Sequence, residues 1–420
     1  MLGRARELDA ADPLTAYRER FDLPEGVIYL DGNSLGALPK ATPERVASVV
    51  RGEWGDGLIR SWNSADWIGM PQRIGGKIAP LIGAEADEVI AADSTSVNLF
   101  KLIAAALAMR PGRKVILSEP GNFPTDLYMI AGLEAQGLAE RRLAPREHIA
   151  EALDEDVALL LLTHVHYKTG EVFDMAALTR AAHEAGALVL WDLSHSAGAI
   201  PVELDACEAD FAVGCGYKYL TGGPGAPAFA YAARRHHDAL AQPLTGWMGH
   251  AAPFAFSDDY APAPGVGRLL CGTPPILGLA ALEVGLDIIA EIGVERLYAK
   301  SQQLSEFFRL CLGELGVDFA LARAERRLVP PPGGLHDLPG PHRPRRDRRL
   351  PRPRHPPPRL RPRIPALRRL GRSRAAPGRG AGKRRVGARG IQRAGGGYLG
   401  PVMVGMLASR DSACVESEVP

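Results

Sequence analysis

The chain has 420 residues, 46% of them hydrophobic, which is enough for two domains around a large core and typical of a globular enzyme. Its formal net charge of +2 combines two unlike parts: residues 323–394 hold 22 Arg, one Lys and three acidic residues, and the rest is acidic, which argues against nucleic acid as a partner of the globular part. Five Cys without CxxC spacing, a charged N-terminus and the lack of a long apolar run exclude a disulfide-rich secreted protein and a membrane protein, so we expect a cytoplasmic one.

The first ninety residues are expected to form mostly helices. Residues 4–22 have a helical charge pattern, with Leu8, Leu14, Tyr17 and Phe21 as a candidate buried stripe. The pattern then predicts a short strand over 27–30, a turn over 31–34, helices over 43–54 and 71–82, and a strand over 88–92.

Three hydroxyl side chains, Ser94, Thr95 and Ser96, precede a helix predicted over 97–109. At least one of them is explained as an ordinary N-cap. The free amides and the dipole of a helix N-terminus also attract anions, so the same residues are candidate phosphate ligands. The local sequence is compatible with both interpretations.

The middle of the chain predicts a strand over 114–117, a loop over 123–126, a strongly apolar strand over 157–162 and a crossover helix over 175–185. His164 and His166 alternate after the second strand, so they would share one face and a metal ligand pair is conceivable. No nearby carboxylate or cysteine completes a ligand set. We therefore predict no metal site.

Two short apolar runs, 187–191 and 211–215, predict neighbouring buried strands of a parallel sheet, and Asp192 and Lys218 follow them. Ligands of open α/β sheets bind at the carboxyl ends of the strands. Pyridoxal phosphate needs a lysine that holds it covalently and a carboxylate against its pyridine nitrogen. Alone, such an acid is usually a cap or turn residue and such a lysine a solvated charge; together they favour this cofactor. A strand over 227–231 and helices over 276–289 and 294–312 follow.

Five separated motifs carry a resemblance to a known family. They are 29–36 (YLDGNSLG), 123–126 (FPTD), 192–195 (DLSH), 216–219 (GYKY) and 246–250 (GWMGH). In this order they resemble the kynureninases, pyridoxal-phosphate-dependent hydrolases of fold type I that act in tryptophan catabolism. The resemblance extends from about residue 20 to about residue 320.

The resemblance implies an α/β fold of the pyridoxal-phosphate-dependent transferase type, with a mainly parallel seven-stranded sheet between helices and a smaller α+β domain. We expect residues 1–50 to be the N-terminal segment of the small domain and 51–290 to be the large cofactor-binding domain. Residues 291–322 would begin the C-terminal part of the small domain, and 323–420 form an anomalous tail that disrupts it.

The same resemblance implies roles for individual residues. Lys218 would hold the cofactor and take the α-proton of the substrate, Asp192 would keep the ring protonated, and Tyr217 would contact the phosphate and donate a proton. The implied cofactor-binding residues are Thr95, Ser96, Phe123, Pro124, Thr125, Asp126, Thr163, Asp192, His195, Tyr217, Lys218, Trp247 and Thr273. Thr95 and Ser96 would bind the phosphate, and Phe123 would stack on the ring. Asn33 and Ser34 would approach the site.

The implied reaction is the hydrolysis of L-kynurenine, or of 3-hydroxykynurenine, to anthranilate or 3-hydroxyanthranilate and L-alanine. Trp247 and Thr273 match positions that reach the partner subunit's active site in this fold type, which implies a homodimer. A cysteine desulfurase-like enzyme is the nearest alternative. It needs a reactive cysteine on a C-terminal loop, where the chain offers only Cys414.

The composition changes at about residue 323. Residues 341–380 contain 15 Arg, ten Pro and a single acid, so we expect disorder. An Arg-rich segment can bind nucleic acid, which is a second alternative. We prefer the hypothesis of a frameshift near residues 320–330, because GC-rich coding sequence in a wrong frame gives this composition. The family's substrate-carboxylate arginine would lie in the lost domain, and no residue of this chain matches it.

Overall fold

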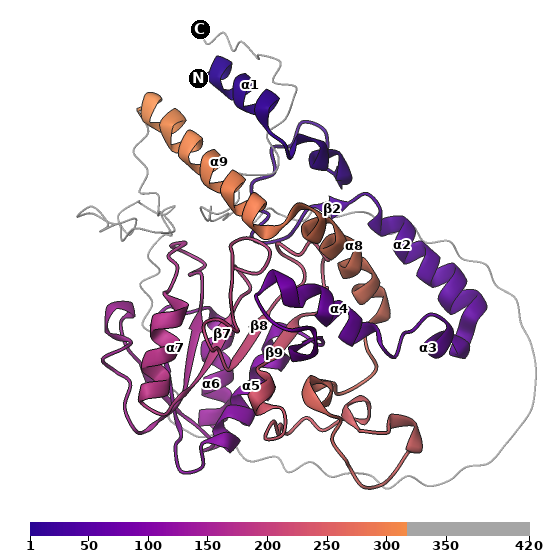
Figure 1. Ribbon diagram of the computed structural model, residues 1–420, viewed down its shortest axis with the longest axis vertical. Coiled ribbons are helices and arrows are strands. Elements are labelled where there is room, and N and C mark those ends of the chain that lie inside the picture. The colour runs from indigo at the N-terminus through magenta and orange to yellow at the C-terminus, as the bar shows by residue number, and fades with distance from the viewer. Residues whose placement is uncertain (317–420) are drawn as a thin grey trace, which may run out of the picture. The chain divides into compact units, whose positions relative to one another are not determined.

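The computed structural model describes residues 1–316 (Figure 1). Its helices are α1 Leu2–Ala11, α2 Thr42–Ser48, α3 Ser61–Ser64, α4 Met70–Ile78, α5 Thr95–Met109, α6 Pro124–Glu134, α7 Met175–Glu184, α8 Ile276–Ile292 and α9 Val294–Glu314. Its strands are β1 Phe21–Asp22, β2 Leu38–Pro39, β3 Val89–Ala91, β4 Val115–Ser118, β5 Glu140–Leu143, β6 Val157–Thr163, β7 Leu188–Asp192, β8 Phe211–Gly214 and β9 Phe229–Ala232. The anomalous tail lies outside the described residues.

Seven of the strands form one sheet in the order β3-β9-β8-β7-β6-β4-β5. Strand β9 is antiparallel to both of its neighbours, and all other pairs are parallel. All residues of the two central strands, β6 and β7, are buried, which explains their continuous apolar sequences. The prediction of a mainly parallel seven-stranded sheet is confirmed.

Helices cover both faces of this sheet (Figure 1). Alternate residues of the central strands enter different core clusters: Leu160 and Trp191 pack in the cluster that holds buried residues of α4, α7 and α8. Leu159 and Leu190 pack in the cluster that holds those of α5 and α6. Because the side chains of a strand alternate between faces, an unbroken apolar run supplies both cores at once.

The carboxyl ends of the central strands meet at one edge of the sheet. Thr163, the last residue of β6, is paired with Asp192, the last residue of β7, and Asp192 is paired with Val213 of β8. Lys218 follows β8 after one short turn. The acid and the lysine therefore leave adjacent parallel strands on the same side, as the sequence predicts.

Two predictions near the N-terminus are wrong. The helix expected over 4–22 is divided into α1 and a 3-10 helix, Thr15–Arg20, because Pro13 interrupts the helix and Asp12 accepts a hydrogen bond from the backbone of Leu14. The strand expected over 27–30 is absent, and Ile28 is 74% exposed. Its apolar residues have no neighbouring strand, so an isolated extended segment gains no ladder hydrogen bonds.

Two further differences concern the boundaries of helices. The loop expected over 123–126 is the first turn of α6, because Pro124 occupies the first helical position, where proline is well tolerated. The helix expected over 43–54 is α2, which continues as a π-helical segment over Val49–Gly57. Strand β5 was not predicted, since Glu140–Leu143 (ERRL) is a mostly exposed edge strand without apolar alternation.

A buried ionic cluster lies at the opposite end of the strands. The carboxylate of Asp210 is 2% exposed; it accepts hydrogen bonds from the backbone of Val189 and from Arg235, and His183 and His236 lie 2.8 and 2.7 Å from its oxygens. Burial alone would raise the pKa of Asp210, but the hydrogen bonds of His183, His236 and Arg235 hold it well below its usual range. The cluster joins β7, α7 and the segment after β9.

We expect Asp210→Ala to lower the free energy of unfolding by about 1–3 kcal/mol at neutral pH, because it leaves the buried backbone amide of Val189 without its acceptor and removes the contacts with His183, His236 and Arg235. A lowered carboxyl pKa stabilises the fold above the unfolded-state value of about 4 and ceases to do so as the pH falls through the folded value. The difference between wild type and variant should therefore shrink in acid. Urea unfolding across this pH range measures it, and a constant difference would contradict the assignment to the Asp210 charge.

Candidate active site

Lys218 is buried beside the ends of β7 and β8. Its Nζ is 2.7 Å from Nε2 of His195 and 5.4 Å from the centroid of the Phe123 ring. Burial, and next the charge of Lys218, lower the pKa of His195 to about 3, so the imidazole is neutral and accepts a hydrogen bond from the ammonium. The structure thus brings together three residues predicted from separate motifs.

Two buried carboxylates, Asp192 and Asp126, lie close enough to Lys218 to interact with its charge. Asp192 is 2% exposed, and its Oδ1 accepts a hydrogen bond of 2.8 Å from the backbone of Ser194. Burial raises the pKa of Asp192, and it raises that of Asp126 well above the usual range, with the Asp192 charge as the next cause. Asp126 Oδ1 is buried and has no hydrogen-bond partner within residues 1–316. An acidic pair of this kind fits a cationic pyridine nitrogen, which supplies the missing positive charge.

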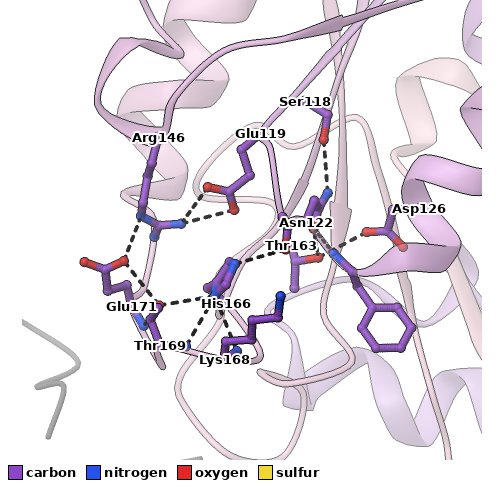
Figure 2. Close-up of polar contacts among 12 residues, drawn as sticks. Ser118, Glu119, Asn122, Asp126, Arg146, Thr163, His166, Lys168, Thr169 and Glu171 are labelled. Carbon is purple, nitrogen blue, oxygen red and sulfur yellow. Dashed lines mark hydrogen bonds and ion pairs between the residues drawn. The ribbon is translucent and has the colours of Figure 1, made fainter. Parts of the chain in front are cut away.

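Asn122 is a residue of the site that the sequence analysis did not identify. Its side chain donates to Ser118 Oγ at 3.1 Å and accepts a hydrogen bond of 2.7 Å from the backbone of Phe123. The hydroxyl of Thr163 lies 2.5 Å from Asn122 Oδ1 and 3.1 Å from Asp126 Oδ2 (Figure 2). Asn122 therefore connects β4, β6 and the start of α6, and it fixes the backbone from which the Phe123 ring projects.

An outer layer of ion pairs supports the same turn (Figure 2). Arg146 lies 3.4 Å from Glu119 and 3.8 Å from Glu171, and its guanidinium covers the ring of Phe173. His166 Nε2 lies 3.2 Å from the carbonyl oxygen of Gly121. These contacts tie the loop after β6 to the turn that precedes Phe123.

His164 and His166 have different partners. His164 Nδ1 is 3.0 Å from Ser196 Oγ, whereas His166 contacts the backbone of Gly121. Burial lowers the pKa of His164 to about 4, which leaves it neutral at physiological pH. Within residues 1–316 no group of three or more metal-ligating side chains is present.

The N-termini of two helices meet at the hydroxyl-rich turn. Ser94 is the N-cap of α5, and its side chain accepts a hydrogen bond from the backbone of Val97. Ser96 Oγ, in the first turn of α5, is 2.8 Å from Thr125 Oγ1, in the first turn of α6. Backbone amides and hydroxyls at two helix N-termini are a suitable environment for a phosphate.

The segment around Asn33 contacts the loop that carries Lys218. The backbone of Gly36 donates a hydrogen bond of 2.9 Å to the carbonyl of Tyr217. A Cβ at Gly36 would lie 2.3 Å from the carbonyl oxygen of Lys218, so only glycine permits this approach. Asn33 is buried, and its Oδ1 has no partner among the described residues.

Tyr217 directly precedes Lys218. Burial, followed by the effects of Cys215 and Asp192, raises the pKa of Tyr217 to about 12, so its hydroxyl stays protonated.

Trp247 and Thr273 lie on two loops that pack against each other, since a Cβ at Gly246 would lie 2.0 Å from the carbonyl oxygen of Cys271. Trp247 is 39% exposed, contacts the rings of Trp62 and Phe254, and belongs to a single 3-10 turn, Trp247–Gly249. Thr273 is exposed as well. Within the part of the chain that the structure describes, neither side chain hydrogen-bonds to Lys218. The ring contacts of Trp247 in residues 1–316 are with Trp62 and Phe254, and neither Phe123 nor His195 is among them.

A lysine and a buried acid at the ends of adjacent parallel strands, beside an aromatic ring and two helix N-termini, define a pyridoxal-phosphate-dependent enzyme of fold type I. The sequence model of the aminotransferase class-V family matches residues 70–320. A kynureninase of Burkholderia mallei (strain SAVP1) is 51% identical over 311 residues, which is 72% of this chain and 75% of that protein. A kynureninase of Pseudomonas fluorescens is 51% identical over 308 residues, 72% of this chain and 74% of that protein. The chain belongs to the kynureninase family.

Solved structures support the fold. The cysteine desulfurase of Thermococcus onnurineus NA1 superposes with a TM-score of 0.60 at 23% sequence identity, covering 76% of this chain and 78% of that one. At this identity the likeness concerns the architecture alone. The family assignment rests on the kynureninases, which are far more similar in sequence.

Proposed function

We propose that this protein hydrolyses L-kynurenine to anthranilate and L-alanine with pyridoxal phosphate as its cofactor, as a step of tryptophan catabolism. The observation that carries the proposal is the placement of Lys218 2.7 Å from His195 and beside the Phe123 ring, in a chain that is 51% identical to proteins named kynureninase over 72% of its length. The cofactor, when bound, withdraws electrons from the substrate carbon next to the amine.

We assign each residue around Lys218 a separate role in that reaction. Lys218 would hold the cofactor and, as the free amine, take the α-proton, while neutral His195 would position its Nζ. Asp192 would keep the pyridine nitrogen protonated, and Phe123 would hold the ring flat. The protonated hydroxyl of Tyr217 would serve as a proton donor. Thr95, Ser96 and Thr125 would bind the phosphate at the two helix N-termini.

The proposed site lacks an assigned partner for the substrate carboxylate. The family resemblance implies an arginine in the C-terminal domain, beyond the residues that the structure describes. Bidentate binding by arginine both attracts and orients a carboxylate. We therefore propose that the cofactor binds and that turnover is slow.

We also propose that residues 51–290 form the cofactor-binding domain and that the enzyme is cytoplasmic. None of the helices within residues 1–316 combines the length and apolar character that crossing a bilayer requires.

A cysteine desulfurase activity has less support. That chemistry needs an accessible thiolate, because the thiolate is the nucleophile. Burial raises the pKa of Cys215, the cysteine nearest in sequence to Lys218, and its Sγ contacts the carbonyl of Ser194 inside the protein. Nucleic-acid binding would depend on the Arg-rich tail, outside the described residues; we propose that nucleic acid is not a partner.

The function is tested with the purified full-length chain, pyridoxal phosphate and three substrates. We expect kynurenine to yield fluorescent anthranilate and alanine, and a parallel assay with 3-hydroxykynurenine decides between the two substrates. Sulfide release from cysteine without anthranilate formation would replace the proposal with the desulfurase alternative. Retention of the full-length chain on nucleic acid in a salt-dependent manner would support the binding alternative.

We further propose that the enzyme is a homodimer with shared active sites. An exposed apolar group on the helical segment 49–64 and the loop 247–260 supports an interface: Trp54 (58% exposed), Ile59 (77%), Phe254 (49%) and Phe256 (78%). Trp247 lies in the same aromatic group and is connected to it by Trp62. Clustered exposed aromatic side chains are typical of protein interfaces.

Subunit mixing tests the shared site. We expect Lys218→Ala and the double variant Trp247→Ala/Thr273→Ala each to lose most activity as pure proteins. Coexpression should restore it to about a quarter of the wild-type level, because half of the dimers are mixed and each contains one intact site. Sedimentation of the wild type checks that a dimer exists. Activity that stays absent in the coexpressed mixture would show that each subunit completes its own site.

A further inference from the structure

Lys101 in α5 is a second buried lysine, and the reaction described above does not use it. Its side chain is 1% exposed and lies in an apolar helix between Phe100 and Leu102. Its Nζ lies 2.5 Å from Asp93 Oδ2 and 2.5 Å from the carbonyl oxygen of Leu269. A buried ammonium is costly unless it is paired, so these two contacts must be maintained in the folded protein.

The first partner, Asp93, shapes the turn that leads into α5. Its φ of +48° lies in the left-handed region, which is uncommon for residues other than glycine. Its carbonyl accepts a hydrogen bond from the backbone of Ala228, and Asn98 of α5 donates to the carbonyl of the preceding Ala92. The turn is thus held by Ala228, the residue before β9, on one side and by the side chains of Asn98 and Lys101 of α5 on the other.

The turn determines where the predicted phosphate ligands point. Asp93 directly precedes the N-cap Ser94 and the first helical residues Thr95 and Ser96. A change in the backbone at Asp93 would rotate the amides and hydroxyls of these three residues together. The contact with Lys101 fixes the Asp93 carboxylate from the next turns of the same helix.

The second partner of Lys101, the carbonyl of Leu269, belongs to a different loop. Leu269 ends a 3-10 helix, Gly265–Leu269, two residues before Cys271, whose carbonyl accepts a hydrogen bond from Met248. Thr273 follows in the same segment. One ammonium therefore joins the hydroxyl-rich turn to the segment that leads to Trp247 and Thr273.

We propose that Lys101 is a positioning residue for the cofactor phosphate. It acts through Asp93: the ion pair keeps the left-handed turn in place, so that the helix N-terminus presents Thr95 and Ser96 to the anion. The inference rests on the proposed function, because the phosphate site is part of it. Lys101 itself makes its contacts with Asp93 and Leu269, away from the amides of the helix N-terminus.

The test compares a phosphorylated with an unphosphorylated ligand. The apoenzyme of the full-length chain is titrated with pyridoxal phosphate and with pyridoxal, and binding is followed by absorbance. For Lys101→Met we expect the Kd for pyridoxal phosphate to rise at least about tenfold and the Kd for pyridoxal to change by less than about twofold. A residue that merely stabilises the core would weaken both ligands alike, which would overturn the proposal, as would an unchanged Kd for both.

Lys77→Met is the matched control. Lys77, in α4, also contacts two carboxylates, those of Glu283 and Asp287, on the surface of the helix layer. This variant should lose stability without changing the ratio of the two dissociation constants. If the wild type itself binds pyridoxal as tightly as pyridoxal phosphate, the proposed phosphate site fails, independently of Lys101.

Asp93 provides a second route if Lys101→Met does not fold. Asp93→Gly tolerates the positive φ but lacks the carboxylate, whereas Asp93→Asn retains an acceptor for Lys101. We expect the phosphate-specific loss in the glycine variant and a smaller one in the asparagine variant. Wild-type affinity for pyridoxal phosphate in a folded Asp93→Gly protein would overturn the proposal.

Discussion

Substitution of Lys218 with alanine is expected to abolish anthranilate formation, with a fall in rate of at least about 10³-fold. In the proposed reaction the lysine would both hold the cofactor and transfer the α-proton, and a positioned general base alone contributes about 10²–10⁴-fold. No other described lysine lies beside His195 and Phe123 to replace it. The measurement is steady-state kynurenine turnover together with the absorbance of the bound cofactor.

Lys114→Ala is the control for this experiment. Lys114 is exposed, and its Nζ donates to the carbonyl of Gly137. It directly precedes β4, at the amino end of the strand, whereas the site lies at the carboxyl ends of the strands. It should leave turnover and the cofactor spectrum unchanged. A Lys218→Ala protein that binds the cofactor with the wild-type spectrum, and still forms anthranilate, would remove Lys218 from its assigned role.

The sequence was most informative where strand periodicity and site chemistry coincide. Apolar runs that end at Asp192 and before Lys218 predicted both the strands and the edge of the sheet that carries the proposed site, because parallel strands align their carboxyl ends. The hydroxyl cluster was predicted at the start of a helix because a helix N-terminus is a local feature that short-range sequence determines, but α5 begins at Thr95 and not at Val97, so Thr95 and Ser96 lie in its first turn.

Contacts over long sequence separations could not be derived in this way. The link between Asn122 and Thr163 requires β4 and β6 to be neighbours in a definite register, and the contact of Lys101 with Leu269 spans 168 residues. Lys101 nevertheless left a signal, since a single lysine stands in an otherwise apolar stretch of helix. The failed strand at 27–30 shows the converse, because apolar residues alone do not form a strand without a partner.

Asp192→Asn is expected to lower turnover by about 10²–10³-fold, the usual cost of removing one electrostatic contact that stabilises the charge developed in the reaction. Asparagine has nearly the same shape but no charge, so the pyridine nitrogen would lose the partner that keeps it protonated. Cofactor should still be held by Lys218. Asp126→Asn, the neighbouring buried carboxylate, is the matched variant, and we expect a smaller loss because Asp126 is the carboxyl whose pKa is raised well above its usual range.

The same pair of variants gives a readout on the apoenzyme that does not depend on catalysis. A carboxyl whose folded pKa is raised stabilises the fold in acid and loses that contribution as the pH rises above the unfolded value of about 4. Burial raises the pKa of both Asp192 and Asp126, and their charges repel each other. Either asparagine variant should therefore have a higher Tm than the wild-type apoenzyme near neutral pH, with the difference disappearing in acid. A Tm that falls in both variants at neutral pH would mean that the two carboxylates stabilise the apoenzyme. The cost of burying their charges would then not explain why the site favours a cationic ring.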